Sequence, residues 1–201
     1  LLLLFSIFTS TAQYNNEFGS TEECYGKTFT IVAWVLTDTT NSIAPLTENQ
    51  VRLAVESVNT KFSGICVDFN LCEFNELPNH RQDTILKGTH DEEIAALYRK
   101  KNVINLYFAT EIIDNDPNPG PCGYAPMGST TIPPDTNKRD AIFLKKSCFT
   151  DVVLAHELGH YFGLYHTFET DANGEESPTG DDCATTGDLV CDTQADPDGT
   201  N

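Results

Sequence analysis

The sequence predicts an α/β (α+β) fold in which helices cover a twisted β-sheet. Two observations indicate it: β-rich apolar runs alternate with helical runs, and no linker divides the chain of 201 residues. Hydrophobic residues make up 39% of the chain and aromatic residues 10%, which is typical of a folded protein. We therefore expect one domain with a sizeable core.

The predicted elements follow one another in the order β-α-β-α-β, loop, β and a last helix. We expect strands in four apolar runs, at residues 29–37, 65–74, 102–113 and 140–146. Thr47 is a suitable N-cap for an amphipathic helix over residues 46–62. A second helix is predicted over 91–101, because acids at its start and bases at its end suit the helix dipole. Residues 114–135 are rich in proline and glycine and are predicted to be mostly loop.

The chain is strongly acidic, with a net charge of −18. This charge argues against nucleic-acid binding, because a phosphate backbone needs a basic surface. Divalent cations suit this charge better than nucleic acid does. Much of the acidity lies after Glu169, in a segment without lysine or arginine. For most of these carboxylates we expect a plain solvated acidic surface.

The N-terminal residues have the pattern of an export signal. Residues 1–13 read LLLLFSIFTSTAQ, an apolar run too short to span a bilayer, with small residues before a cleavage point near Ala12 or Gln13. We interpret them as part of a secretory signal peptide, so that the protein is secreted and the mature chain lies outside the membrane. We expect residues 14–28 to be a pro-segment remnant or an N-terminal extension, and residues 29–201 to form the domain.

The cysteine count fits an exported protein with disulfide bonds. Seven is an odd number, so at least one cysteine lacks a partner within this sequence. The sequence alone does not assign the pairs among Cys24, Cys66, Cys72, Cys122, Cys148, Cys183 and Cys191.

The run HELGHYFGLYH contains three of the five histidines of the chain. On a helix predicted over residues 150–163, His156 and His160 lie one turn apart on the same face, where two imidazoles can bind one metal ion. Gly163 can adopt the left-handed conformation that ends a helix. The chain then turns sharply, and His166 can come back as a third ligand.

The two sides of this predicted helix differ in character. Glu157 lies about 100° around the axis from His156, close to the metal without pointing at it, which suits a general base better than a ligand. Val152 and Val153 lie near the metal-facing side. The opposite side is expected to pack in the core and is formed by Leu154, Leu158, Tyr161 and Phe162.

Three neutral imidazoles with one open position are typical of a catalytic zinc site, because structural sites are closed by four protein ligands. Zinc in such a site lowers the pKa of its bound water to about 7, and a nearby carboxylate takes the proton. It also polarises a peptide carbonyl. The alternative is that each histidine is an isolated residue, but the added G-x-x-H makes a chance match rare. His80 and His90 lack such neighbours, and we expect them at the surface.

The sequence HELGHYFGLYH resembles the zinc motif H-E-x-x-H-x-x-G-x-x-H of the metzincin metalloproteases. The segments HTFE and GDLVCDTQADP that follow are similar to those of the pappalysin family, in its cytophagalysin and ulilysin-like branch. The resemblance implies a metzincin-like catalytic domain with a twisted mixed sheet, a backing helix and an active-site zinc helix. It also implies that Glu157 is the base and that the zinc ligands are His156, His160 and His166.

The resemblance further implies a substrate strand and a second ion. Gly123, Tyr124 and Ala125 match an edge strand, which would bind an extended peptide by adding it to the sheet. Calcium is implied in the loop after the zinc helix, because carboxylates and carbonyls suit this ion. A plain acidic loop is the alternative. The matching positions are Asp188, Asp192 and Thr193.

The chain also departs from the family pattern. Gln194 stands where the family usually has proline. The only methionine is Met127, so the methionine-containing turn that metzincins carry after the third histidine is not in this sequence. We therefore expect a fragment with an incomplete C-terminal subdomain, in which Cys183 or Cys191 is unpaired. We expect Cys24 to form an ordinary disulfide; the alternative, implied by relatives in which a pro-segment cysteine binds the zinc, is that Cys24 keeps the enzyme latent.

These observations predict a secreted zinc-dependent endopeptidase that acts on a peptide or protein substrate. Its cofactors would be one catalytic Zn²⁺ and, as the resemblance implies, Ca²⁺. The alternative is a metal-stabilised binding module, or an inactive fragment, that keeps the ligands without the chemistry. Glu157 favours the enzyme, because a purely structural site does not need this residue.

Overall fold

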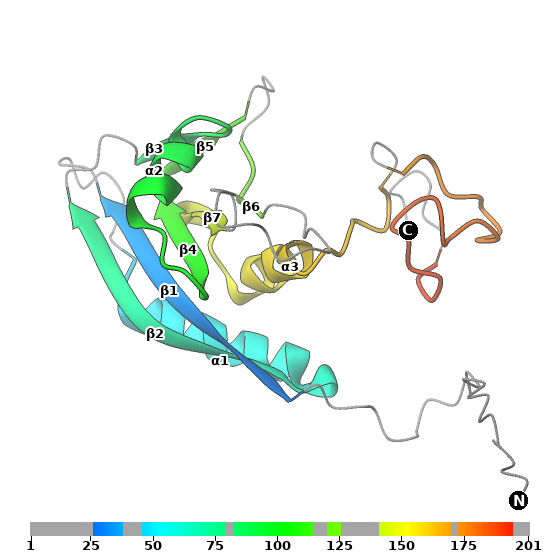
Figure 1. Ribbon diagram of the computed structural model, residues 1–201, viewed down its shortest axis with the longest axis horizontal. Coiled ribbons are helices and arrows are strands. Elements are labelled where there is room, and N and C mark those ends of the chain that lie inside the picture. Colours follow the sequence, from blue (N-terminus) through cyan, green and yellow to red (C-terminus); the bar gives the residue numbers. More distant parts are fainter. Residues whose placement is uncertain are drawn as a thin grey trace, which may run out of the picture.

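The computed structural model has an α/β fold built on a twisted, mixed five-stranded sheet, which confirms the predicted fold class (Figure 1). The strands lie in the order β2-β1-β4-β7-β6. Four of them pair in parallel: β1 (Lys27–Thr37), β2 (Val67–Pro78), β4 (Ile104–Ala109) and β7 (Ala141–Lys145). The edge strand β6 (Gly123–Tyr124) runs antiparallel to β7. The structure describes residues 26–37, 46–78, 83–114, 120–125, 141–169 and 173–194.

Two helices cover one face of the sheet, α1 (Glu48–Phe62) and α3 (Asp151–Tyr161) (Figure 1). The predicted N-cap of α1 is confirmed: Thr47 and Gln50 form a capping box that satisfies backbone donors at the start of the helix. The side chains that α1 directs to the sheet recur at helical spacing and are buried, namely Val51, Ala54, Val55 and Val58. They form one core with the facing side chains of β1, β2 and β4.

The other face of the sheet carries a second apolar core. Helix α2 (His90–Tyr98) packs there together with a small parallel sheet formed by β3 (Thr84–Leu86) and β5 (Glu111–Ile113). Because both faces are covered, all six residues of β4 are buried, as expected for a central parallel strand.

The prediction of one continuous strand over residues 102–113 is wrong, because this segment is divided between two sheets. It forms β4 and β5, and the break lies at Thr110. The backbone N–H of Thr110 donates to the backbone oxygen of Asp83 at 2.9 Å and to its Oδ1 at 2.8 Å. Its hydroxyl donates to Oδ2 at 2.6 Å. These bonds to a residue far away in the sequence replace the ladder at this position and direct the chain into the second sheet.

A buried ion pair completes this junction. Lys146 donates to Asp83 Oδ1 at 2.8 Å, and the two side chains are 6% and 8% exposed. Lys146 also donates to the backbone oxygen of Leu36 and to Thr110 Oγ1. Because each charge is hydrogen-bonded, the pair is tolerated in the interior. It fixes the end of β7, from which the short 3₁₀ helix η2 (Lys146–Cys148) leads to α3.

Other predicted boundaries also need correction. Helix α2 ends at Tyr98 instead of residue 101, because Arg99, with φ −54° and ψ 130°, leaves the helical conformation. The bases expected in its last turn therefore lie outside the helix. Strand β2 begins at Val67, after the short 3₁₀ helix η1 (Ser63–Ile65) and Cys66 in the left-handed region. Strand β1 begins two residues before the predicted start of the domain.

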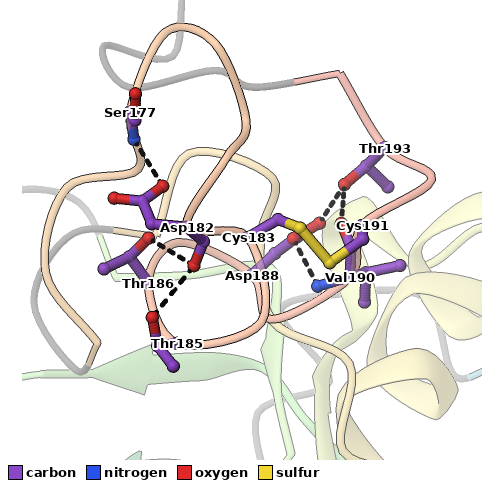
Figure 2. Close-up of a disulfide and its surroundings, with 9 residues drawn as sticks. All are labelled: Ser177, Asp182, Cys183, Thr185, Thr186, Asp188, Val190, Cys191 and Thr193. Atoms are coloured by element: carbon purple, nitrogen blue, oxygen red, sulfur yellow. Dashed lines mark hydrogen bonds between the residues drawn. A yellow bond between two sulfur atoms is a disulfide. The ribbon is translucent and has the colours of Figure 1, made fainter.

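Two disulfides lie within the described residues, Cys122–Cys148 and Cys183–Cys191. The second one corrects the expectation that Cys183 or Cys191 is unpaired, because the two lie on one loop and pair with each other (Figure 2). Cys66 is also disulfide-bonded, and among the described cysteines Cys72 is free and exposed. The predicted signal peptide, most of the 14–28 segment and the latency candidate Cys24 lie outside the described residues. In the described ranges no helix has the length and apolar character needed to cross a bilayer.

Candidate active site

Helix α3 is held at its start by polar contacts with α1. Thr150 is the N-cap and accepts the Val153 N–H at 3.2 Å. Asp151 accepts a hydrogen bond from Ser57 at 2.6 Å and pairs with Lys61 at 3.0 Å, and these contacts lower the pKa of Asp151. The negative charge also suits the N-terminus of a helix. The start of α3 is therefore fixed against the backing helix.

The two sides of α3 separate largely as predicted. Leu154 and Leu158 are fully buried in the core, and Val152 and Val153 line an open cleft on the other side. Phe162 differs from the prediction, because it is 41% exposed. Its ring still packs against that of Phe29 in a T-shaped pair, with ring centroids 5.0 Å apart.

The chain reverses directly after α3, as Gly163 predicted. Gly163 has φ +96°, in the left-handed region that favours glycine. The Leu164 N–H donates to the Gly159 oxygen at 3.0 Å, and the Gly163 N–H donates to the His160 oxygen at 2.9 Å. These two bonds are those of a Schellman motif, which satisfies the last carbonyls of the helix. The reversal brings His166 back beside the helix.

The reversal places three histidines around one point. The Nε2 atom of His160 lies 3.0 Å from that of His156 and 3.0 Å from that of His166, and the remaining pair is 3.2 Å apart. A group of at least three histidine, cysteine or acidic side chains could bind a metal ion if all its ligand atoms lie within 4.8 Å of one another. Within the ranges that the structure describes, these three histidines form such a group. Ligand nitrogens about 2.0–2.1 Å from a tetrahedral zinc would be separated by about 3.3 Å. The spacing of the histidine nitrogens therefore fits one zinc ion.

The protonation of the histidines also fits a metal site. His160 Nδ1 lies 2.7 Å from the backbone oxygen of Leu164, so Nδ1 carries the hydrogen and Nε2 keeps its lone pair. The pKa values of His156 and His166 are lowered by burial and by the neighbouring imidazoles. Neutral imidazole is the form that binds metal ions.

Glu157 lies next to the histidines and is 4% exposed. Burial raises its pKa to about 7, although the Ala125 N–H and the charge of Lys87 act in the opposite direction. Its Oε2 atom is buried and has no hydrogen-bond partner among the described residues. A buried carboxylate with a raised pKa and one unpartnered oxygen can chemically accept a proton from a group in the cleft.

The edge strand β6 forms another wall of the cleft. Gly123 and Tyr124 are the strand itself, and Ala125 directly follows it; all three line the cleft together with the histidines. Tyr124 is oriented by its hydroxyl, which donates to Asp91 Oδ2 at 2.8 Å. The Cys122–Cys148 disulfide ties the start of this strand to η2, close to the N-terminus of α3.

Sequence reasoning missed the ion pair that lines the same cleft. Lys87 Nζ lies 3.1 Å from Asp114 and 5.3 Å from the centre of the Tyr124 ring. Lys87 follows β3 and Asp114 follows β5, so the pairing of these strands brings the two residues together. No local sequence pattern predicts the contact between these two residues, because the small sheet that brings them together was not predicted.

The acidic loop after α3 contains a second polar cluster (Figure 2). Asp188 is 4% exposed, and its carboxylate accepts the Val190 N–H at 2.9 Å and the Thr193 hydroxyl at 2.8 Å. The structure thus brings two of the three predicted calcium residues together. The third, Asp192, is exposed.

Glu176 was missed by the sequence reasoning, because nothing distinguishes it from the exposed acids around it. It is 3% exposed, and neither carboxylate oxygen has a hydrogen-bond partner among the described residues. Its pKa is raised by burial and by the charges of Asp188 and Asp182. Gly187 has φ +61° and leaves room for it, because a Cβ there would lie 3.0 Å from Glu176 Oε2.

Residues 88–200 match the family model described as Pregnancy-associated plasma protein-A. The chain belongs to this family, the pappalysins, which are metzincin metalloproteases. Its branch within the family is not resolved by this match. The matched range includes the three histidines, Glu157, the edge strand and the acidic loop.

Among solved structures, one chain titled "Structure of a chaperone-substrate complex" is similar, with 16% sequence identity and a TM-score of 0.46. The match covers 82% of the present chain and 31% of the other. No curated protein matches the sequence.

Replacing Gly163 by alanine should destabilise the protein. A side chain in the left-handed region costs about 1–2 kcal/mol, and we expect the free energy of unfolding to fall by about that amount, as measured by urea denaturation. Gly159→Ala is the matched control: it lies within α3, and its added Cβ would lie 3.7 Å from Leu164 Cδ1 and 4.0 Å from Leu164 Cβ, which are ordinary contacts. If Gly163→Ala were as stable as Gly159→Ala, the strained reversal would not be needed.

Proposed function

We propose that this chain is the catalytic part of a secreted zinc-dependent endopeptidase. The observation that supports it most directly is the convergence of three Nε2 atoms within 3.2 Å of one another, beside a buried glutamate. Membership of the pappalysin family supports a metalloprotease in general. The present chain spans 31% of the solved chain to which it is similar, so the activity of the whole protein is part of the proposal.

In this proposal His156, His160 and His166 would hold the zinc through Nε2, and all three histidines line the cleft. When bound there, zinc supplies a Lewis acid that activates water and polarises the carbonyl of a peptide bond. The backbone oxygen of Leu164 keeps the His160 ring in the tautomer that can bind the ion. The residues present therefore fit zinc in donor type, number and spacing.

Glu157 is proposed as the general base. Its Oε2 atom is the unpartnered one, so this oxygen is free to take a proton from the attacking water and to pass it to the leaving amine. A peptide in the extended conformation would bind along the free edge of β6 through backbone hydrogen bonds. Gly123, Tyr124 and Ala125 would supply that edge.

Secretion is part of the same proposal. The two disulfides of the described residues support an oxidising environment. The apolar run at residues 1–13 supports export through a signal peptide.

Glu157→Ala in the full-length protein should lower the cleavage of casein by about 10²–10⁴-fold, the usual contribution of a positioned general base. Zinc content, measured by metal analysis, should stay at the wild-type level because no imidazole is removed. Glu56→Ala, on the exposed face of α1, is the control and should cleave like the wild type. A chelator should abolish cleavage, and added zinc should restore it.

The same assay separates the enzyme from a metal-stabilised binding module. A binding module would bind zinc and cleave nothing, with or without Glu157. Full activity in Glu157→Ala would instead show that the base is assigned to the wrong residue.

Calcium in the acidic loop is proposed as a stabilising ion. Asp188 and Thr193 already lie together, and Glu176 adds a buried carboxylate without a hydrogen-bond partner in the described part of the chain. Backbone oxygens of this loop would have to complete the six to eight ligands that calcium takes. Burial and the charges of Asp188 and Asp182 raise the pKa of Glu176, and a bound cation would offset the repulsion between these carboxylates and that of Glu176.

Added calcium should therefore raise the melting temperature of the wild-type protein, and Glu176→Gln should reduce that rise. The neighbouring Glu175→Gln is the matched control, because Glu175 is exposed and its loss should leave the calcium effect unchanged. Equal calcium effects in the two variants, or none in the wild type, would leave the plain acidic loop as the correct interpretation.

A further inference from the structure

The backbone groups of the edge strand are divided between its two sides. The Lys145 N–H donates to the Cys122 oxygen at 2.7 Å, and the antiparallel register pairs Gly123 with Leu144. In an antiparallel ladder, successive residues direct their N–H and C=O groups alternately to one neighbour and to the other. Cys122 and Tyr124 therefore face β7, whereas Gly123 and Ala125 face the open side of the strand, which lines the cleft.

One of these open-side groups is already in use. The Ala125 N–H donates to the carboxylate of Glu157, and Oε2 is the oxygen without a partner, so the bond is made to Oε1. The two oxygens of Glu157 are therefore not equivalent. Ala125, the residue after the strand, holds Oε1, whereas Oε2 has no hydrogen-bond partner among the described residues.

The position of Gly123 also depends on Glu157. A Cβ built on Gly123 would lie 3.0 Å from Glu157 Cγ, 3.0 Å from Glu157 Oε1 and 3.0 Å from Leu144 Cδ2. Carbon atoms in ordinary contact are about 3.5–4.0 Å apart, so one of these neighbours would have to move. Leu144 is fully buried in the core and is enclosed by other side chains, whereas Glu157, although only 4% exposed, lines the cleft. Glu157 is therefore the group that a side chain at position 123 would displace.

We propose that β6 and the residue after it position the base: the Ala125 N–H binds Glu157 Oε1, and the missing side chain of Gly123 leaves the space that the carboxylate occupies. This proposal rests on the proposed peptidase function and adds a role for the edge strand beyond binding the substrate. It also assigns the backbone groups of the strand. Because the Ala125 N–H is taken by the base, the open-side groups left for a peptide are the N–H and C=O of Gly123 and the C=O of Ala125.

The base and the substrate would then be aligned by the same two residues. A peptide paired with Gly123 comes to lie beside the carboxylate that Ala125 holds. The Cys122–Cys148 disulfide and the bond from Lys145 to Cys122 keep the strand in place relative to α3. An error of about 1 Å in the position of a reacting group costs about 100-fold in rate. Holding the base and the substrate on the same short segment should therefore raise kcat.

The test is a double-mutant cycle between positions 123 and 157 in the full-length protein. Gly123→Ala alone should lower kcat for a fluorogenic peptide by about 10- to 100-fold through displacement of the carboxylate, with KM within about twofold of the wild type. Glu157→Asp should also lower kcat, because the side chain is one methylene shorter. In the Glu157→Asp background, however, Gly123→Ala should cost less than about threefold, because the added methyl group occupies the vacated space.

Two further measurements make the result specific. Zinc content should be equal in all four proteins, which excludes loss of the metal as the cause. Ala125→Pro removes the N–H, and proline is tolerated where a strand has no neighbour on that side. It should lower kcat much more than Ala125→Ser, which keeps the N–H.

Other outcomes would overturn the proposal. Independent effects that multiply in the double variant would show that Gly123 does not act through Glu157. A rise in KM with unchanged kcat would show that the strand only binds substrate. A wild-type protein that loads zinc and cleaves no peptide would overturn the proposed function, and this proposal with it.

Discussion

The convergence of three Nε2 atoms depends on the sharp reversal of the chain after α3. Without it, His166 would be carried along the helix axis, away from the pair on the helix. The reversal needs a left-handed residue, which Gly163 supplies, and two backbone bonds that satisfy the end of the helix. One of the carbonyls in the same turn, that of Leu164, also orients the His160 ring. The helix terminus and the site are thus built from the same few residues.

The site also depends on elements that are distant in the sequence. Buried Leu154 and Leu158 hold α3 against the sheet, and the contacts of Asp151 hold its start against α1. The edge strand reaches the other side of Glu157 and is kept there by the Cys122–Cys148 disulfide. Each connection leaves the histidine side of α3 open to the cleft, where a substrate would approach.

The sequence predicted what local spacing determines. Periodicity was sufficient for α1 and α3, and the H-E-x-x-H-x-x-G-x-x-H motif identified the histidine cluster and the turn at Gly163. Contacts between distant residues were not predictable. The break at Thr110 depends on Asp83, 27 residues earlier. The apolar pattern of residues 102–113 does not indicate this break. Glu176 is one acid among many in the sequence, and its burial follows from the folding of its loop. The odd cysteine count could not reveal that Cys183 pairs with Cys191.

The most direct test of the site is to determine the metal and its ligands in the full-length protein, purified without chelators. Metal analysis should find one zinc bound by the histidine cluster of each chain. X-ray absorption at the zinc edge should show three imidazole nitrogens at about 2.0–2.1 Å, with an oxygen in the fourth position. Absence of stoichiometric zinc, or a sulfur ligand at about 2.3 Å, would contradict an open site formed by His156, His160 and His166.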